Sequence, residues 1–231
     1  MKRLISLLIL CICFTNVSIA QNDEEGAIKL FDESHVTVSS HLFSRVPRIT
    51  VGFITSINYR WLAGIEIGFN GGFTAYERDN TWIGSNYKLF EIRPQLYYTF
   101  TNNPKIRSYI SGELFYINHQ DTFRNEFFIL SGTDLNVEFE SADYTRIKTG
   151  INFHFGVFKS IYKGFGINPS IGLGLRYRKV DYRNVRNGII IDPNNLDDEE
   201  NLFGSLDNYI TDEGSTFGFN MVISIKLYYK F

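Results

Sequence analysis

The chain has 231 residues and a formal net charge of −2, with 23 Lys and Arg against 25 Asp and Glu. This length suits one domain of barrel or sandwich size. The chain lacks the excess of basic residues that would indicate nucleic acid as a partner. Phe and Tyr are frequent, with 21 and 14 copies, whereas both cysteines, Cys11 and Cys13, lie in an early apolar stretch. Beyond that stretch, no window of about eighteen apolar residues predicts a transmembrane helix.

The start of the chain has the pattern of a secretory signal peptide. Lys2 and Arg3 precede an apolar stretch, and Ser18 and Ala20 place small residues three and one positions before a cut after Ala20. We expect residues 1–20 to be removed during export. Both cysteines leave with that segment, so the mature chain is expected to contain no disulfide and no thiol chemistry.

Eight later segments alternate between apolar and polar residues, as β-strands with two different faces do. In one of them, Val51 and Phe53 share an apolar face that is opposed by Thr50 and Gly52. The eight predicted strands are 35–43, 49–59, 63–73, 90–100, 110–116, 147–157, 165–177 and 221–231.

The connections between these strands alternate in length. Short turns near Arg60, at 101–106 and at 159–164 are interleaved with longer connections at 77–86, 118–145 and 181–215. This alternation predicts an antiparallel up-and-down barrel with its short turns at one end and its long loops at the other. Eight strands fit best, and ten are the alternative if 127–130 and 135–139 pair as an extra hairpin.

The two faces of the predicted strands differ in composition. The polar face is rich in glycine, which suits a narrow eight-stranded barrel whose interior is just wide enough for side chains. The apolar face has aromatic residues near both ends, such as Tyr98 and Phe100 near the short turns and Phe90 and Tyr177 near the long connections. Two aromatic girdles are typical of barrels that span a membrane.

The final segment, MVISIKLYYKF, has an unbroken apolar or aromatic face and ends on Phe231. With Leu227 and Tyr229 at alternate positions before that residue, it resembles the assembly signal of bacterial outer-membrane β-barrels. The chain from residue 34 onward resembles the porin-like outer-membrane barrel families of the Bacteroidetes, of OmpA/OmpX size. The resemblance implies residence in the outer membrane of a Gram-negative bacterium, contact with its lipid, and insertion by the barrel-assembly machinery.

Charged residues occupy the polar face, which the barrel turns toward its lumen. Acids lie on the third to fifth predicted strands and bases on the sixth to eighth, apart from one base on the acidic side. These lumen residues are Glu66, Glu91, Arg93, Glu113, Lys148, Arg176 and Lys226. Because unpaired charges in a confined lumen are unfavourable, opposite signs should face each other.

Counting residues from the short turns predicts the pairs. Arg93 and Glu113 come to similar heights on neighbouring strands, and Glu91 comes to the height of Lys148 and Arg176 across the barrel. A lower layer holds Glu66 and Lys226 together with His154. The pairs predict a closed lumen, while a selective pore lining is the alternative.

The sequence does not meet the patterns of an enzyme or a metal site. His154 is followed by Phe155 and Gly156, so it lacks the His-x-Ser pair of the lipid-modifying barrels. The acidic run 192–200 could hold calcium, but it lacks the spacing of an EF-hand loop. We expect no catalytic residue, no cofactor and no metal site.

The sequence therefore predicts an all-β protein, a single antiparallel transmembrane up-and-down β-barrel that is exported to the outer membrane. Its parts are a signal peptide at 1–20, a short periplasmic segment at 21–33 and the barrel at 34–231. Its expected role is structural or surface interaction through exposed outer loops at 119–145 and 182–215, with no extracellular ligand identified. A small-solute pore or transporter is the alternative function.

Overall fold

The computed structural model describes residues 33–40, 48–69, 84–100, 105–133, 135–191 and 211–231. The expected signal peptide and the acidic run 192–200 lie outside these residues. Within them, no helix is both long and apolar enough to cross a membrane. The strands of the described part are β1 (Ser34–Ser40), β2 (Ile49–Ser56), β3 (Trp61–Phe69), β4 (Lys88–Thr99), β5 (Ile106–Ile129), β6 (Asn136–Tyr162), β7 (Phe165–Arg186), β8 (Ile189–Ile191) and β9 (Gly214–Lys230).

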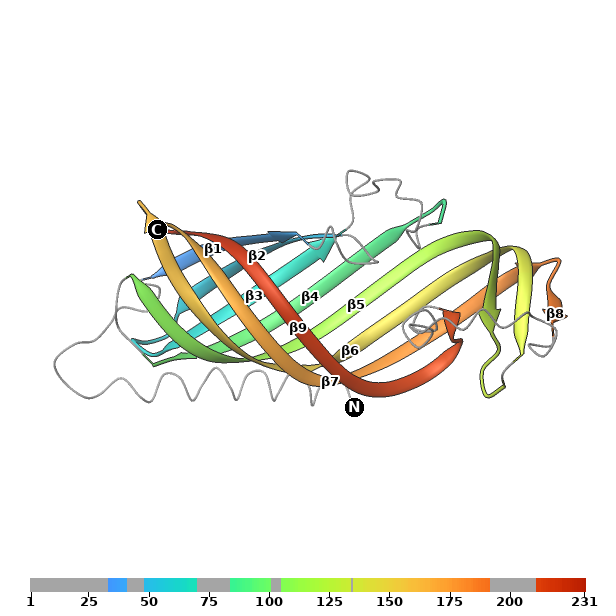
Figure 1. Ribbon diagram of the computed structural model, residues 1–231. Helices are drawn as coiled ribbons and strands as arrows, with labels where there is room; N and C mark the ends of the chain where they lie inside the picture. Colours follow the sequence, from blue (N-terminus) through green and yellow to red (C-terminus); the bar gives the residue numbers. More distant parts are fainter. Residues whose placement is uncertain (1–32, 41–47, 70–83, 101–104, 134, 192–210) are drawn as a thin grey trace, which may run out of the picture.

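Eight of these strands form a closed ring in which all pairings are antiparallel. β1 to β6 each pair with the next strand in sequence, β7 pairs with β9, and β9 pairs with β1 to close the ring. The short β8 pairs with Asn136–Glu138, at the far end of β6. The predicted all-β, eight-stranded, up-and-down fold is confirmed, and Figure 1 shows the tilted strands wrapping around an elongated interior.

The turn between β6 and β7 is shorter than the sequence predicted. The expected connection at 159–164 shrinks to Lys163 and Gly164, because β6 continues to Tyr162 and β7 begins at Phe165. Both turn residues have positive φ, 40° and 85°. Two successive positive φ values are characteristic of the type I′ turn, whose twist matches that of the flanking strands.

The prediction of an outer loop at 119–145 is wrong, because β5 and β6 cover most of this range. β5 and β6 run far past the ring as one hairpin, with continuous pairing from Ile106↔Lys159 to Ile129↔Asn136 apart from an irregularity at Asn125. Residues 127–130 and 135–139 do face each other, but they are the end of this hairpin and not an additional one. The ten-stranded alternative is therefore not realised, since the extra residues lengthen two strands of the ring.

These strands form an extension beyond the ring, which we define as residues 117–146 of β5 and β6, 178–186 of β7, and β8 (Figure 1). Asn125, with φ 53°, interrupts the alternation of β5, and Asn tolerates this left-handed conformation better than most residues. The extension has an apolar core of its own, in which Phe128 stacks on Tyr182 with ring centroids 4.4 Å apart. Its members are Phe123, Phe128, Val137, Phe139, Ala142, Tyr144, Val180 and Tyr182.

The ring itself has the opposite arrangement of polarity. We call its outward apolar surface the belt; on β9 it includes Met221, Ile223 and Ile225, which are 67–70% exposed. The alternating residues Ser224 and Lys226 point inward and are 8% exposed. The structure thus confirms which side chains of these strands were predicted to point outward and which inward. On β7, for example, Gly172 is buried and Leu173 is exposed.

Candidate functional site

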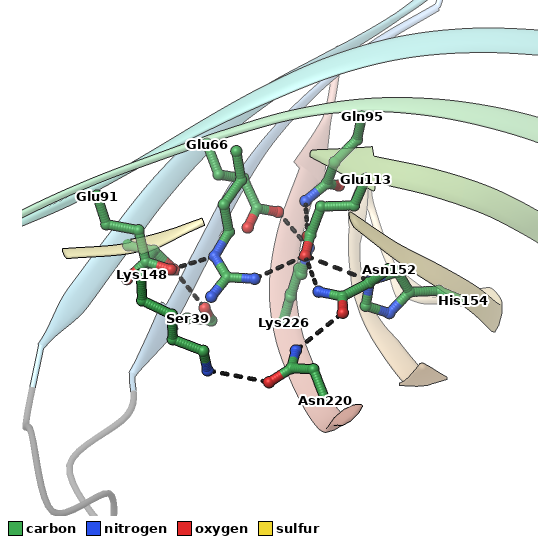
Figure 2. A network of polar contacts seen from close by, with 12 residues as sticks. Ser39, Glu66, Glu91, Gln95, Glu113, Lys148, Asn152, His154, Asn220 and Lys226 are labelled. Carbon is green, nitrogen blue, oxygen red and sulfur yellow. Dashed lines mark hydrogen bonds and ion pairs between the residues drawn. The ribbon is translucent and has the colours of Figure 1, made fainter. Parts of the chain in front are cut away.

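The inward side chains of the ring meet in a polar network that fills the middle of the lumen. Period-two alternation places Glu66 on β3, Arg93 on β4 and Glu113 on β5 on the same inner surface. Figure 2 shows residues from facing parts of the ring converging on this point, including Lys226 from β9 and Asn152 from β6. The lumen charges that the sequence singled out therefore belong mostly to one connected group.

Glu113 is the centre of this network. It is 3% exposed, and its carboxylate accepts hydrogen bonds of 2.7 Å from Arg93 Nη1, from Gln95 Nε2 and from Asn152 Nδ2. His154 Nε2 lies 3.4 Å from Oε1 of the same carboxylate. An ionised carboxylate can accept about four hydrogen bonds, so this arrangement satisfies most of its capacity.

A second ion pair joins the two sides of the closing seam. Lys226 on β9 donates to Glu66 on β3, and both side chains are buried. A cavity of about 20 Å³ remains between this pair, Arg93 and Glu113. That volume holds about one water molecule and no larger solute.

Glu91 contacts two arginines, and its predicted pairing with Lys148 is not formed. It is fully buried and lies between Arg48 and Arg93, both of which donate to its carboxylate. Lys148, one of the two predicted partners, donates instead to Asn220 Oδ1 at 2.9 Å. Arg48 immediately precedes β2, and β2 and β6 each lie two strands from β4 in the ring, so strand order alone does not select Arg48 over Lys148.

Several residues of the lumen network were not predicted from the sequence, because they lie at the ends of predicted strands or are uncharged. The sequence pattern places Arg48 in a connection, and it places Arg146 next to a loop that is in fact part of β6. Asn152 and Asn220 link Glu113 to Lys148 through hydrogen bonds of 2.7–2.9 Å. Both asparagines occupy inward positions in the period-two alternation of β6 and β9, and this position could have identified them as lumen residues.

Below the ionic network, an aromatic layer fills the lumen near the short turns. This layer was not predicted from the sequence, because the same strands have aromatic residues on both their inward and their outward faces. The Tyr97 and Tyr109 rings meet edge-on with centroids 5.0 Å apart, and Tyr109 donates to Asn168 Oδ1 at 2.7 Å. The buried apolar side chains of this layer are Ile54, Leu62, Tyr97, Tyr109, Phe158 and Tyr228.

Glu33 ties strand ends together at the rim below this layer. Its carboxylate lies 2.9 Å from Arg107 Nη1, 2.9 Å from His35 Nε2 and 3.3 Å from Lys230 Nζ. Burial raises the pKa of Glu33, but the hydrogen bond with His35 and the charges of Arg107 and Lys230 outweigh it and lower the pKa to about 2. This cluster connects the start of β1 with β5 and β9.

The residues of the expected assembly signal lie on the outer surface at the end of β9, with Phe231 just after the strand. Leu227, Tyr229 and Phe231 are all exposed, whereas the alternating Tyr228 is buried in the aromatic layer. Tyr229 also packs against Phe165 of β7, with ring centroids 4.8 Å apart. These three side chains therefore continue the belt at its short-turn end.

Chemically, the lumen network pairs buried charges, and among the described residues it does not present an activated nucleophile. His154 faces Glu113 in the interior and is 8% exposed. Within the described residues, no group of three or more His, Cys, Asp or Glu side chains is arranged to hold a metal ion. The described network consists of ion pairs and side-chain amides.

Comparison with known proteins gives two structural likenesses. No protein-family model matches the chain, and no curated protein matches it. The crystal structure of the N-terminal β-barrel domain of Pseudomonas aeruginosa OprF is similar with a TM-score of 0.44 and 10% identity, over 88% of this chain and 100% of that one. The crystal structure of a major outer membrane protein from Thermus thermophilus is similar with a TM-score of 0.41 and 8% identity, over 86% and 99%. No activity, ligand or partner follows from similarity at this level.

Proposed function

We propose that this chain is an integral outer-membrane β-barrel protein with a closed lumen, which holds the extension outside the membrane as a surface for interaction. The observation that carries the proposal is the belt. Leu173 and Ile223 are 64% and 70% exposed, and their neighbours around the ring are also large and apolar. A soluble protein rarely exposes so continuous an apolar surface, whereas hydrocarbon solvates it well.

Besides an apolar outer surface, a membrane-spanning sheet needs fully paired backbone groups, and the closed ring meets this requirement. In hydrocarbon, an unpaired backbone N–H or C=O costs several kcal/mol, so a sheet that crosses the bilayer must have no free edge. The pairing of β9 with β1 supplies this closure, since Val36↔Tyr229 and Val38↔Leu227 face each other across the seam. Outward apolar side chains and internal backbone pairing together favour the bilayer as the environment.

A pair of adjacent cysteine variants on β9 tests the location. Ile223→Cys and Ser224→Cys place a thiol on the outside and inside of the same strand, in a mature chain that is expected to have no other cysteine. We expect a fluorophore at position 223 to be quenched by nitroxides on the lipid chains and one at position 224 to be protected. If a charged, water-soluble maleimide labelled position 223 in vesicles while lipid nitroxides left it unquenched, the belt would not face lipid.

The closed lumen favours a structural or interaction role over a pore. An aromatic layer and an ionic layer lie one above the other, and the cavity within the ionic layer has room for about one water molecule. We expect purified protein in a planar bilayer to show no steady conductance. A stable, ion-selective conductance whose selectivity changes in Glu113→Gln would favour the pore instead.

We further propose that the barrel-assembly machinery recognises the outward residues Leu227, Tyr229 and Phe231. Deletion of Phe231 should then leave the chain in the periplasm to be degraded, while the full chain reaches the outer membrane. Equal outer-membrane levels of both forms would exclude this recognition. Export by the signal peptide, a Gram-negative host, the porin-like family and the absence of enzymatic activity stay predictions.

A further inference from the structure

The outer surface of the belt has a groove at Gly112 on β5. Ile110 and Leu114, two residues away on either side, point outward and are exposed, so Gly112 is an outward position without a side chain. A Cβ atom at Gly112 would meet nothing within 4 Å. The residues that pair with Gly112 on the two neighbouring strands are Leu96 and Phe153. The gap that Gly112 leaves is therefore bounded by large apolar side chains.

This groove crosses the strands and rises away from the short turns. Its volume is about 850 Å³, within the range of about 300–1,000 Å³ that ligand pockets have. A row of paired residues follows it across β4, β5, β6, β7 and β9, namely Leu96, Gly112, Phe153, Leu173 and Met221. At one end, Trp61 is the first residue of β3 after a short turn, whereas Met221 lies nine residues before the end of β9 at Lys230. The groove thus extends from the short-turn rim into the belt.

A positive group lies at the rim end of the groove. Trp61 and Tyr98 line this end, and their rings meet edge-on with centroids 5.1 Å apart. Arg60 Nη1 donates to the hydroxyl of Tyr98 at 2.8 Å, and the guanidinium carbon lies 5.2 Å from the centroid of the Tyr59 ring. A guanidinium has five N–H donors, and the contact with Tyr98 uses one of them. The exposed Arg60 is therefore placed to bind an anion at the mouth of an apolar groove.

The charges of the ring favour an anion at this end. Among the described side chains of the short-turn rim, the one acid is Glu33, and it already contacts Arg107 and Lys230. The bases of the same rim are Arg60, Lys105, Arg107, Lys159, Lys163 and Lys230. Basic groups beside the aromatic residues of a membrane interface attract the headgroups of anionic lipids.

We infer that the groove binds an acyl chain of an anionic glycerophospholipid, whose phosphate contacts Arg60. The inference rests on the proposed function, which places the belt in hydrocarbon and the short-turn rim at the level of the headgroups. The acyl chain lies in the gap at Gly112, and the planar guanidinium suits two oxygens of the phosphate.

A lipid fits the groove better than a second copy of the chain does. The gap results from one missing side chain, which suits a flexible hydrocarbon chain. Below the extension, the described residues of the ring strands include no outward acid that could pair with Arg60 of another copy. The phosphate of a lipid supplies the negative charge that such a copy lacks.

Trp61 reports on the rim end of the groove directly. The chain has two tryptophans, so Trp82→Phe leaves Trp61 as the single tryptophan. This refolded mature barrel is placed in phosphatidylcholine vesicles that contain a fraction of either phosphatidylglycerol or phosphatidylcholine with brominated acyl chains. At high salt, which screens general attraction, we expect the concentration dependence of Trp61 quenching to give about fivefold tighter association of the brominated phosphatidylglycerol.

Two charge variants separate a site from general attraction. Arg60→Gln should reduce the preference for phosphatidylglycerol to about one. Lys163→Gln removes a charge from the turn between β6 and β7 at the same rim, away from the groove, and should keep the preference. Equal losses in both variants would overturn the site. Equal quenching by both lipids before these changes would overturn it while leaving the belt in lipid, whereas quenching by neither would overturn the proposed membrane location as well.

Filling the groove gives an independent test. Gly112→Leu adds an outward side chain where a Cβ atom meets nothing, so the variant should fold, as heat-modifiability on a gel will show, and should lose the preference. Val51→Leu, which enlarges an outward residue of β2 outside the groove, is the matched control and should keep it. Full preference in folded Gly112→Leu would overturn the inference. A disulfide-linked dimer of Gly112→Cys at a high lipid-to-protein ratio would also overturn it, because a second copy would then occupy the groove.

Discussion

The belt and the extension are built from the same strands with opposite polarity. On β6, the belt residues Phe153 and Phe155 point outward and are exposed, while Asn152 and His154 point into the lumen. Higher on the same strand, Tyr144 points inward into the apolar core of the extension, and its neighbours on the outer face are polar. The alternation continues along the strand, but the apolar side changes from outside to inside.

This reversal indicates which solvent each region meets. An apolar outer face is stable in hydrocarbon, and an apolar inner core under a polar surface is stable in water. The change occurs where the outward residues pass from Tyr116 to Asn118 on β5 and from Tyr177 to Lys179 on β7. We therefore expect the membrane boundary to lie at this height, with the extension in the aqueous phase.

The largest effect should come from breaking the charge network inside the belt. Glu113→Gln removes the acceptor that Arg93 contacts at 2.7 Å and leaves a buried cation less well compensated. Disruption of one side of a buried pair costs about 3–5 kcal/mol, so the free energy of unfolding in urea should fall by that order. The double variant with Arg93→Gln should recover part of the loss. A neutral effect of Glu113→Gln would argue that the lumen is wet and the pair screened.

A phenylalanine from each region gives the next comparison. Phe128→Ala opens the buried core of the extension and should cost about 3 kcal/mol of local stability, measured as faster hydrogen exchange in residues 126–139. Phe153→Ala removes a ring that is 67% exposed on the belt and should cost about 1 kcal/mol or less. Equal losses at both positions would contradict the opposite polarity of the two regions.

The sequence predicted the ring because the outward face of each of its strands has a clear period of two. It did not predict the extension. In that part of β5 the outward residues, such as Asn118 and Thr122, are polar and resemble loop residues, whereas the apolar residue Phe123 points inward. Counting heights did bring Arg93 and Glu113 together. Counting heights could not identify Arg48 as a partner of Glu91. A residue that precedes a strand has no face assigned by the alternation, and the tilt of the strands determines which position of the sheet its side chain reaches.

A new charge on each outer face tests the boundary directly. Leu173→Arg puts a guanidinium in the belt, where Arg costs about 2–4 kcal/mol near the midplane of a bilayer. Gln120→Arg puts the same group on the exposed outer face of β5 in the extension and should be nearly neutral. Unfolding in lipid vesicles, followed by heat-modifiability on gels, measures both. A neutral Leu173→Arg would mean that the belt does not face hydrocarbon.

The smallest expected effect lies at the short-turn rim, where Glu33 titrates in contact with water. Its pKa in the folded chain is about 2, below the ordinary value of 4.5, so the carboxylate stabilises the fold above about pH 4.5. That stabilisation should disappear as the pH falls from 4.5 toward 2. Because the side chain is one-fifth exposed, we expect about 1–2 kcal/mol.

Glu33→Gln provides the comparison for this rim cluster. The variant should be less stable than the unmodified chain at neutral pH, and the difference should close on acidification through the same window. His35 and Lys230 keep their other contacts in the variant, so the ring should still close through the β1–β9 pairs. A difference that persisted unchanged at pH 2 would show that Glu33 acts through packing and not through its charge.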